Sequence, residues 1–427
     1  MIIGAGKQRH ERNRRPTLSR PTCRRKPLSP GVLWIAFTGI LVVGHACGGQ
    51  FTDPLDGKFD ASAYLAENAY GFLPVPIIIT EPALGGFGLG LVGIFFHENE
   101  EQREQRKKAA LESEDAVRYL IPPSASAVLG AYTANGSWLA GGGHMAIWKQ
   151  DKIRYNVGLG YGSINLEFYG AGNIEFNKPL ELNNKGTFFF QEIKFRIAGS
   201  KFLLGAQQSL TGIKVEPKDL EGSIGGFLPP AIEDELIPLI EDLITTDDTM
   251  SALGLVAEWD NRDHLFNPHK GYNYKLDYLW YDDVIGSDFD YQHWNLKGLN
   301  YWKFSESWLG GLRLEGDALD GDDLLPLYAI PFVRLRGIPA MRYQGRYVAV
   351  GEVELTWRPN LRWSLLGFAG AGRTAEKFSD LGDGPSYTSR GLGFRYLVAR
   401  RYGMNMGIDV ARGPEDTVLY IQAGSSW

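Results

Sequence analysis

The chain of 427 residues is poor in cysteine and in long apolar runs. Its two cysteines, Cys23 and Cys47, are too few for a disulfide scaffold. Residues 32–47 form its one long uncharged apolar stretch, which is too short and too isolated for a protein built of membrane-spanning helices. Its 53 glycines and 12% aromatic residues are instead typical of barrels that cross a membrane with strands.

Basic residues are scarce beyond the N-terminus. Residues 1–31 hold nine of the 44 Lys and Arg but only one of the 50 Asp and Glu. The remaining 35 basic and 49 acidic residues give the rest of the chain a formal charge of −14. A surface that binds nucleic acid needs Lys and Arg against the phosphates, so this acidic balance argues against nucleic acid as a partner.

The basic N-terminus and the apolar stretch together predict a secretory signal peptide over residues 1–46, with a long basic n-region. Cleavage is expected after Ala46, and lipidation of Cys47 is the alternative at this position. Residues 47–82 are too few for a soluble domain, so we expect a short periplasmic or plug-like segment. Export is therefore expected, and it is compatible with a location in the outer membrane of a Gram-negative bacterium.

Polar and apolar residues alternate from residue 83 to residue 427 with a period of two, which is the period of a β-strand. Near the C-terminus, for example, Val353 and Leu355 alternate with Glu352 and Glu354. Charges on the inner face would be costly in a dry core but not in a watery lumen. We therefore predict an all-β fold, a transmembrane antiparallel β-barrel, over residues 83–427.

The pattern predicts sixteen strands, an even number as expected for such barrels. Their approximate ranges are 85–97, 125–134, 137–149, 151–162, 163–172, 186–198, 200–215, 250–260, 270–282, 288–303, 306–317, 345–358, 361–373, 387–399, 401–411 and 416–427. Tight joins alternate with long hydrophilic loops, which indicates two different rims. The long loops 97–124, 216–250, 319–344 and 374–386 are expected to face the outside of the cell.

Aromatic residues are placed as in membrane barrels. Many tryptophans fall near proposed strand ends, where their rings favour the membrane–water boundary. They are Trp138, Trp148, Trp280, Trp294, Trp302, Trp308, Trp357 and Trp363. The last strand puts Leu419, Ile421 and Trp427 on one face and ends on an aromatic residue, which resembles the signal read by the outer-membrane assembly machinery.

Residues 260–272 have the sequence DNRDHLFNPHKGY. They resemble a turn between two strands in the BamA/TamA superfamily of bacterial surface antigens, where Asp260, Arg262, Pro268 and Gly271 match. Turn chemistry alone would also favour these residue types. The second motif is VRLRGI at residues 333–338, in the long loop before the twelfth strand.

In that superfamily the loop carries an Arg-Gly-aromatic tip that folds into the lumen. Arg336 and Gly337 match this tip, whereas Ile338 replaces the aromatic residue. The glycine lets the tip turn sharply, and the guanidinium can bind a carboxylate through two parallel hydrogen bonds. The alternative for Arg336 is an exposed arginine with a weak surface ion pair.

The resemblance implies that the loop arginine meets acids on the next two strands. Glu354 occupies the matching place on the twelfth strand, but Gly370 stands where the thirteenth strand of the superfamily has an aspartate. We expect Glu352 or Asp409 to compensate. The expected loop lock in the lumen thus consists of Arg336, Gly337, Glu354 and Glu352.

The sequence does not predict an enzyme. His264 and His269 lie beside two aspartates, but turn residues at a barrel rim explain them without a metal ion. The chain has no Gly-x-Ser-x-Gly motif, so a hydrolase would have to assemble its centre from distant strands, for example around His144 or His293. We predict no catalytic residue, no metal and no cofactor.

The resemblance implies a role in membrane assembly or transport. Superfamily members normally carry periplasmic polypeptide-transport-associated domains, and residues 47–82 leave no room for one. We therefore expect a reduced translocation or insertion barrel, with a passive pore or a structural membrane protein as the alternative. The expected partners are outer-membrane lipids and lipopolysaccharide, the barrel-assembly machinery for the chain's own insertion, and a separate periplasmic protein; an oligomer is left open.

Overall fold

The computed structural model describes residues 51–68, 72–97, 124–149, 151–171, 174–218, 245–264, 267–321, 325–424 and 427, and a few residues between 100 and 112. The chain divides into two units, residues 1–48 and 49–427, and all of the described residues belong to the second unit. The predicted signal peptide, residues 1–46, and Cys47 lie outside the described residues.

The described residues form the short α-helix α1 (Ser62–Asn68), several 3₁₀ turns and sixteen strands, and the described residues between 100 and 112 are also helical. The 3₁₀ turns are η2 (Pro82–Leu84), η4 (Asp283–Ile285), η5 (Leu327–Ala329), η6 (Phe378–Asp380) and η7 (Arg400–Tyr402). The strands are β1 (Phe72–Ile79), β2 (Gly88–Phe96), β3 (Ser124–Thr133), β4 (Trp138–Trp148), β5 (Ile153–Ala171), β6 (Ile174–Arg196), β7 (Phe202–Pro217), β8 (Thr246–Asp260), β9 (Gly271–Tyr281), β10 (Tyr291–Lys303), β11 (Trp308–Gly321), β12 (Tyr347–Trp357), β13 (Trp363–Ala375), β14 (Ser386–Ala399), β15 (Met404–Arg412) and β16 (Thr417–Ala423).

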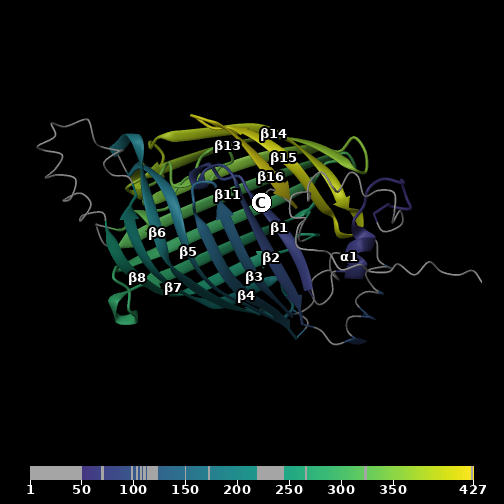
Figure 1. Cartoon of the computed structure of the whole chain (residues 1–427), viewed down its shortest axis with the longest axis horizontal. Helices are drawn as coiled ribbons and strands as arrows, with labels where there is room; N and C mark the ends of the chain where they lie inside the picture. The colour runs from purple at the N-terminus through teal and green to yellow at the C-terminus, as the bar shows by residue number, and fades with distance from the viewer. Residues whose placement is uncertain are drawn as a thin grey trace, which may run out of the picture. The chain divides into compact units, whose positions relative to one another are not determined.

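The sixteen strands form a single barrel-shaped sheet (Figure 1). Each strand pairs with the next one in the chain, and the pairing is antiparallel from β1 to β16. The predicted all-β antiparallel barrel of sixteen strands is therefore confirmed. β1 and β16 are the two edge strands in this order. Among the described residues, no helix combines the length and the apolar composition needed to cross a membrane.

Two strand assignments from the sequence are wrong, and the errors cancel in the count. The first strand is β1, which lies within residues 47–82, the segment expected to precede the barrel. It was not recognisable by alternation, because it is apolar throughout and contains Pro74 and Pro76. The predicted strands 151–162 and 163–172 form one continuous strand, β5.

Glycine explains why β5 continues through the predicted break. Gly160 pairs with Phe188 of β6, and a Cβ at Gly160 would lie 2.3 Å from the Phe188 ring. The glycine therefore makes room for a neighbouring side chain and does not end the strand. Residues 174–185, which the sequence pattern leaves outside any strand, form the first half of β6 and extend this pairing.

The connections between strands alternate between two rims. Rim A holds the connections that follow odd-numbered strands, including residues 322–346 between β11 and β12. Rim B holds those that follow even-numbered strands, including residues 358–362 between β12 and β13. Because β1 precedes it, the connection after β2 begins and ends at rim B, where Phe96 and Ser124 lie; most of residues 98–123 lie outside the described residues. The expectation that all four long loops share one rim is therefore wrong for this loop.

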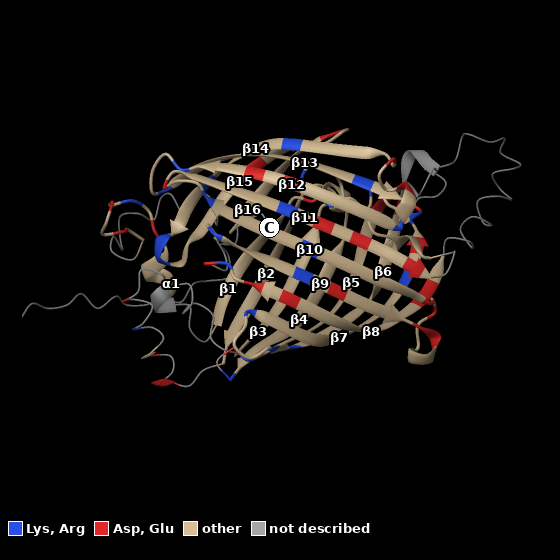
Figure 2. Cartoon of the chain, turned by 180° about the vertical axis from the view of Figure 1, so that it is seen from behind, with Lys and Arg blue, Asp and Glu red and all other residues tan. Residues whose placement is uncertain are grey.

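The two faces of the sheet differ in polarity, as the alternation predicts. Leu355 points outward and is 47% exposed, whereas Glu352 on the same strand, β12, points inward and is 1% exposed. Charged residues are spread over many strands of the barrel (Figure 2). Many inward-facing charges are paired: Lys194 Nζ, for example, lies 2.8 Å from Glu192 and 2.7 Å from Glu258.

Seven of the eight predicted tryptophans lie at or next to strand ends, and Trp294 is the fourth residue of β10. Trp148 ends β4 and Trp357 ends β12, both at rim B, whereas Trp138 begins β4 at rim A. All of them except Trp280 are well exposed on the outward face. Two belts of exposed rings near the rims agree with the predicted membrane–water boundaries.

Candidate functional site

Residues 325–346, here called the lumen loop, fold back against the inner face of β12 and β13. Val333, Leu335 and Ile338 are buried in one apolar cluster with residues of β12. The glycines of β13 make room for this packing: a Cβ at Gly370 would lie 2.6 Å from Leu335, and one at Gly372 would lie 2.4 Å from Val333. The missing aspartate at position 370 therefore has a steric reason.

Arg336 lies at the centre of a buried ionic group, here called the lumen cluster. Its Nε is 2.6 Å from Glu352 Oε1, and its Nη2 is 2.9 Å from Glu354 Oε2. Its Nη1 donates to Asp409 Oδ2 of β15 at 3.0 Å. The guanidinium carbon lies 3.5 Å from the centre of the Phe368 ring, a cation–π contact. The structure thus brings together Arg336, Glu352 and Glu354, and adds Asp409.

Two further arginines balance the three carboxylates of the lumen cluster. Arg395 Nη1 lies 2.5 Å from Asp409 Oδ1, and Arg313 Nη2 lies 3.1 Å from Glu352 Oε2. Three guanidinium groups therefore face three carboxylates, of which Glu352 and Asp409 are fully buried. Removing one partner would leave a buried charge uncompensated, so the whole group constrains the loop.

Gly337 allows the lumen loop to turn at its tip. Its φ of +90° is in the region that favours glycine, and a Cβ here would lie 2.9 Å from the backbone nitrogen of Gly413. The Gly337 N–H donates to the hydroxyl of Tyr420 on β16 at 2.9 Å. Near the other edge strand, Glu81 accepts the Ala340 N–H at 2.9 Å, and burial raises the pKa of Glu81. The loop therefore contacts residues next to both edges of the sheet.

The C-terminal Trp427 does not share a face with Leu419 and Ile421, so that prediction is wrong for this residue. β16 ends at Ala423, and Gly424 follows with a φ of +83°. The Trp427 Nε1–H then donates to Glu352 Oε2 at 3.2 Å, inside the lumen cluster. Leu419 stays on the exposed outward face, and Ile421 is partly buried.

The predicted turn residues lie together at rim B. Arg262 donates from Nε and Nη2 to the carboxylate of Asp260, both at 2.9 Å. Pro268 is buried, and Gly271 has a φ of +106° with the Asn261 oxygen 2.6 Å from the position of a Cβ. These contacts fix the shape of the turn and account for the residue types.

The two histidines of this turn have structural partners. His264 Nδ1 accepts the Asn267 N–H at 2.9 Å. The backbone N–H of His269 donates to Asp263, and burial, reinforced by Arg358, lowers the pKa of His269 to about 4. His269 is therefore neutral near neutral pH, beside the charged Arg358.

A second buried arginine, which the sequence analysis missed, lies at rim B. Arg362 Nη2 is 2.5 Å from Asp53, Nε is 2.6 Å from Asp56, and Nη1 is 2.6 Å from Asp60. We call these four residues the rim cluster. The hydrogen bond from Arg400 is the main cause that lowers the pKa of Asp53 to about 2. The spacing of the three aspartates ahead of α1 is the only sequence signal for this site.

The histidines considered for a hydrolase lie on different faces of the barrel. Ser126 Oγ lies 2.9 Å from His144 Nδ1 and 2.7 Å from His97 Nε2. Ser126 lies on the same face as the exposed Val128. Among the described residues, no carboxylate forms a hydrogen bond with His144, so the third member of a catalytic triad is not in place. His293 bonds Asp317 at 3.0 Å within the lumen.

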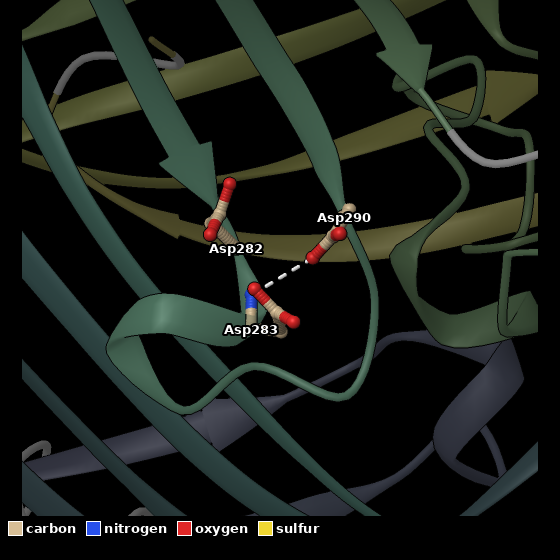
Figure 3. Close-up of side chains that lie close together, drawn as sticks. All are labelled: Asp282, Asp283 and Asp290. Atoms are coloured by element: carbon tan, nitrogen blue, oxygen red, sulfur yellow. Dashed lines mark hydrogen bonds between the residues drawn. The ribbon is translucent and has the colours of Figure 1, made fainter.

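One group of acids at rim A has the spacing of metal ligands. Carboxylate oxygens of Asp282, Asp283 and Asp290 lie within 4.8 Å of one another (Figure 3). Asp290 accepts the Asp283 N–H at 2.8 Å, and Asp282 accepts the Val284 N–H at 3.0 Å. These hydrogen bonds cap the turn after β9 and account for two of the three carboxylates.

Comparison with known proteins identifies the fold. No protein-family model matches the chain, and no curated protein does. Among solved structures, the chain is similar to BamA from Haemophilus ducreyi lacking POTRA domains 1–3, with a TM-score of 0.50, 11% identity, and coverage of 83% of this chain and 68% of that chain.

Two further solved structures are similar. CdiB from Acinetobacter baumannii has a TM-score of 0.50 and 9% identity, and CdiB from Escherichia coli has 0.52 and 8%. Each match covers 83% of this chain, but less than two thirds of either CdiB chain: 59% and 62%. At these identities the likeness concerns the fold alone. The sixteen-stranded barrel of this chain is thus similar to the BamA and CdiB barrels.

Proposed function

We propose that this protein is an outer-membrane barrel that translocates or inserts a client, and that the lumen loop narrows the path through it. The exposed apolar outer face, the belts of tryptophan and the likeness to BamA and CdiB support the membrane location. Rim B would then face the periplasm and rim A the outside, because the N-terminal segment joins the barrel at rim B.

The single observation that carries the proposal is the lumen cluster. Arg336 sits on a loop, whereas its three carboxylates belong to β12 and β15. The loop can leave the lumen only if these buried ion pairs break, which costs about 3–5 kcal/mol when one partner is removed. A passive channel has no need for such a costly attachment across its lumen.

Conductance in planar bilayers tests the proposal. The wild type is expected to show low, flickering conductance, and Arg336→Ala should raise it because the loop tip loses its ionic contacts. Arg336→Lys should give an intermediate result, since an ammonium keeps the charge but cannot bind two carboxylates with a planar fork. Unchanged conductance in Arg336→Ala would count against the proposal.

Arg342→Ala is the matched control. Arg342 belongs to the same loop, but its partner Glu415 is 41% exposed at rim A, 2.5 Å away. Its loss should leave the conductance close to that of the wild type. The alternative, a passive pore or a structural protein, predicts steady conductance in every variant and no client. Crosslinking that captures a defined client would refute this alternative.

A further inference from the structure

Four neighbouring strands of the barrel contain no charged residue. β1, β2, β3 and β4 have no Lys, Arg, Asp or Glu, whereas every strand from β5 to β15 has at least one. The charged, water-filled lumen expected from the sequence is therefore lined by charged strands on only part of the barrel wall. The remaining part is apolar on both faces, and its inward face requires an explanation.

A cavity of about 870 Å³ lies against the inner face of this apolar wall. Apolar residues of all four strands line it, among them Leu73, Val75, Val92, Ile94, Ala127 and Met145. Their neighbours in sequence point outward, since Leu91 is 55% and Val128 52% exposed. The volume falls within the roughly 300–1,000 Å³ typical of small-molecule sites.

The other side of the cavity combines an exposed ring with polar groups. Phe190 of β6 also lines it and is 45% exposed, with its ring over Gly158. Glu192, Gln207 and Lys275 line the cavity as well, and Lys275 Nζ lies 3.0 Å from Glu192 Oε2. The cavity is therefore amphipathic, with a broad apolar wall facing a small polar one.

The cavity also reaches the edge of the sheet. Leu73 and Val75 belong to the edge strand β1, and Met404 at the start of β15 lines the cavity too. Pro74 and Pro76 share one edge of β1 and lack the N–H that would extend the ladder there. A lipid chain beside this edge would have a short path to the cavity.

We propose that the cavity binds an acyl chain of a membrane phospholipid, with the headgroup toward Glu192, Gln207 and Lys275. An apolar wall of this extent is unfavourable against water and favourable against a hydrocarbon chain. The polar side supplies hydrogen-bond donors and acceptors for a headgroup. This site goes beyond the proposed transport role and does not depend on it.

Photo-crosslinking of the wild-type protein tests the site at residue level. The full chain in detergent is illuminated with a phospholipid that carries a diazirine in its acyl chain, and labelled residues are located by peptide mass spectrometry. Ile94 lines the cavity and Phe95 points outward, so label at both residues supports the site. Label at Phe95 and other outward residues only would overturn it.

A second arm uses a free fatty acid with the same diazirine. Label of cavity residues by the phospholipid supports the proposal, and label of those residues by the fatty acid alone overturns it. This arm separates a membrane lipid from a soluble amphiphile with the same chain.

Ala127→Trp and Val128→Trp form a matched pair of variants. The first places an indole in the cavity, and the second places it on the outward face of the same strand. Ala127→Trp should reduce label at Ile94 roughly tenfold, because the indole occupies cavity space that the acyl chain would otherwise fill. Val128→Trp should leave it unchanged, and label at Phe95 serves as the internal reference. Equal label at Ile94 in both variants would overturn the proposal.

Discussion

The lumen cluster and the rim cluster both place one arginine among three carboxylates, but they attach different segments. In the lumen cluster the arginine belongs to a loop, and the acids belong to strands. In the rim cluster the arginine lies in the tight turn before β13, and the acids belong to the segment ahead of α1. The same chemistry thus fixes a loop inside the barrel and the N-terminal segment at its rim.

Solvent access distinguishes the two clusters. The side chain of Asp409 in the lumen cluster is 0% exposed, whereas that of Asp56 in the rim cluster is 21% exposed. Water screens charges and hydrates a carboxylate that loses its partner. Loss of a charge should therefore cost more in the lumen than at the rim, which three variants can test.

The largest effect is expected for Asp409→Ala. The Asp409 carboxylate accepts hydrogen bonds from Arg336 and Arg395. Its removal therefore leaves two buried guanidinium groups with fewer partners. Breaking a buried pair in this way typically costs about 3–5 kcal/mol. Guanidinium-induced unfolding in detergent micelles should show this decrease in the free energy of unfolding.

Glu216→Ala is the control for this variant. Glu216 pairs with Lys214 at 2.6 Å, but both side chains are nearly half exposed. Removal of such a surface pair should leave the free energy of unfolding close to that of the wild type. If the two variants lose the same free energy, burial does not explain the strength of the lumen cluster.

The rim cluster should contribute less and should depend on pH. The hydrogen bond from Arg400 lowers the pKa of Asp53 from 3.8 to about 2, which corresponds to about 2 kcal/mol. Because folding lowers this pKa, the contribution is complete above pH 3.8 and is lost as the pH falls through about 2. Unfolding of the wild type and Asp53→Asn across this range measures it.

The informative quantity is the difference in the free energy of unfolding between the wild type and Asp53→Asn. It should be constant near neutral pH, shrink as the pH falls below 3.8, and nearly vanish below about 2. A difference that grows as the pH falls would have the wrong sign and would contradict the role of Asp53.

The lumen cluster could be predicted from the sequence, but the rim cluster could not. Glu352 and Glu354 alternate with apolar residues, and this pattern marks them as inward-facing. Arg336 was placed by its resemblance to a known loop tip. Arg362 has no such signal, because a single arginine in a tight turn is common and its aspartates lie about 300 positions earlier in the chain.

The alternation also explains which strands could be predicted. It depends on contact with lipid on one face and with charged groups or water on the other. β12 meets both conditions, whereas the wall formed by β1 to β4 is apolar on both faces. β1 lacks the pattern altogether and was missed, and the apolar cavity beside it could not be anticipated. The inward position of Trp427 likewise could not be predicted, because it depends on a turn after β16 that the two-residue alternation does not indicate.

The smallest effect is expected for Gly372→Ala, which tests whether packing helps the ion pairs to hold the lumen loop. A Cβ at Gly372 would lie 2.4 Å from a methyl group of the fully buried Val333, so the loop must shift. One added methyl group in a packed site should cost about 1 kcal/mol. Gly367→Ala on the same strand is the control, since its Cβ would meet Leu392 at an ordinary 3.5 Å. If denaturant unfolding shows equal stability for both variants, charge alone holds the loop, and the two arginine clusters differ only in their exposure to water.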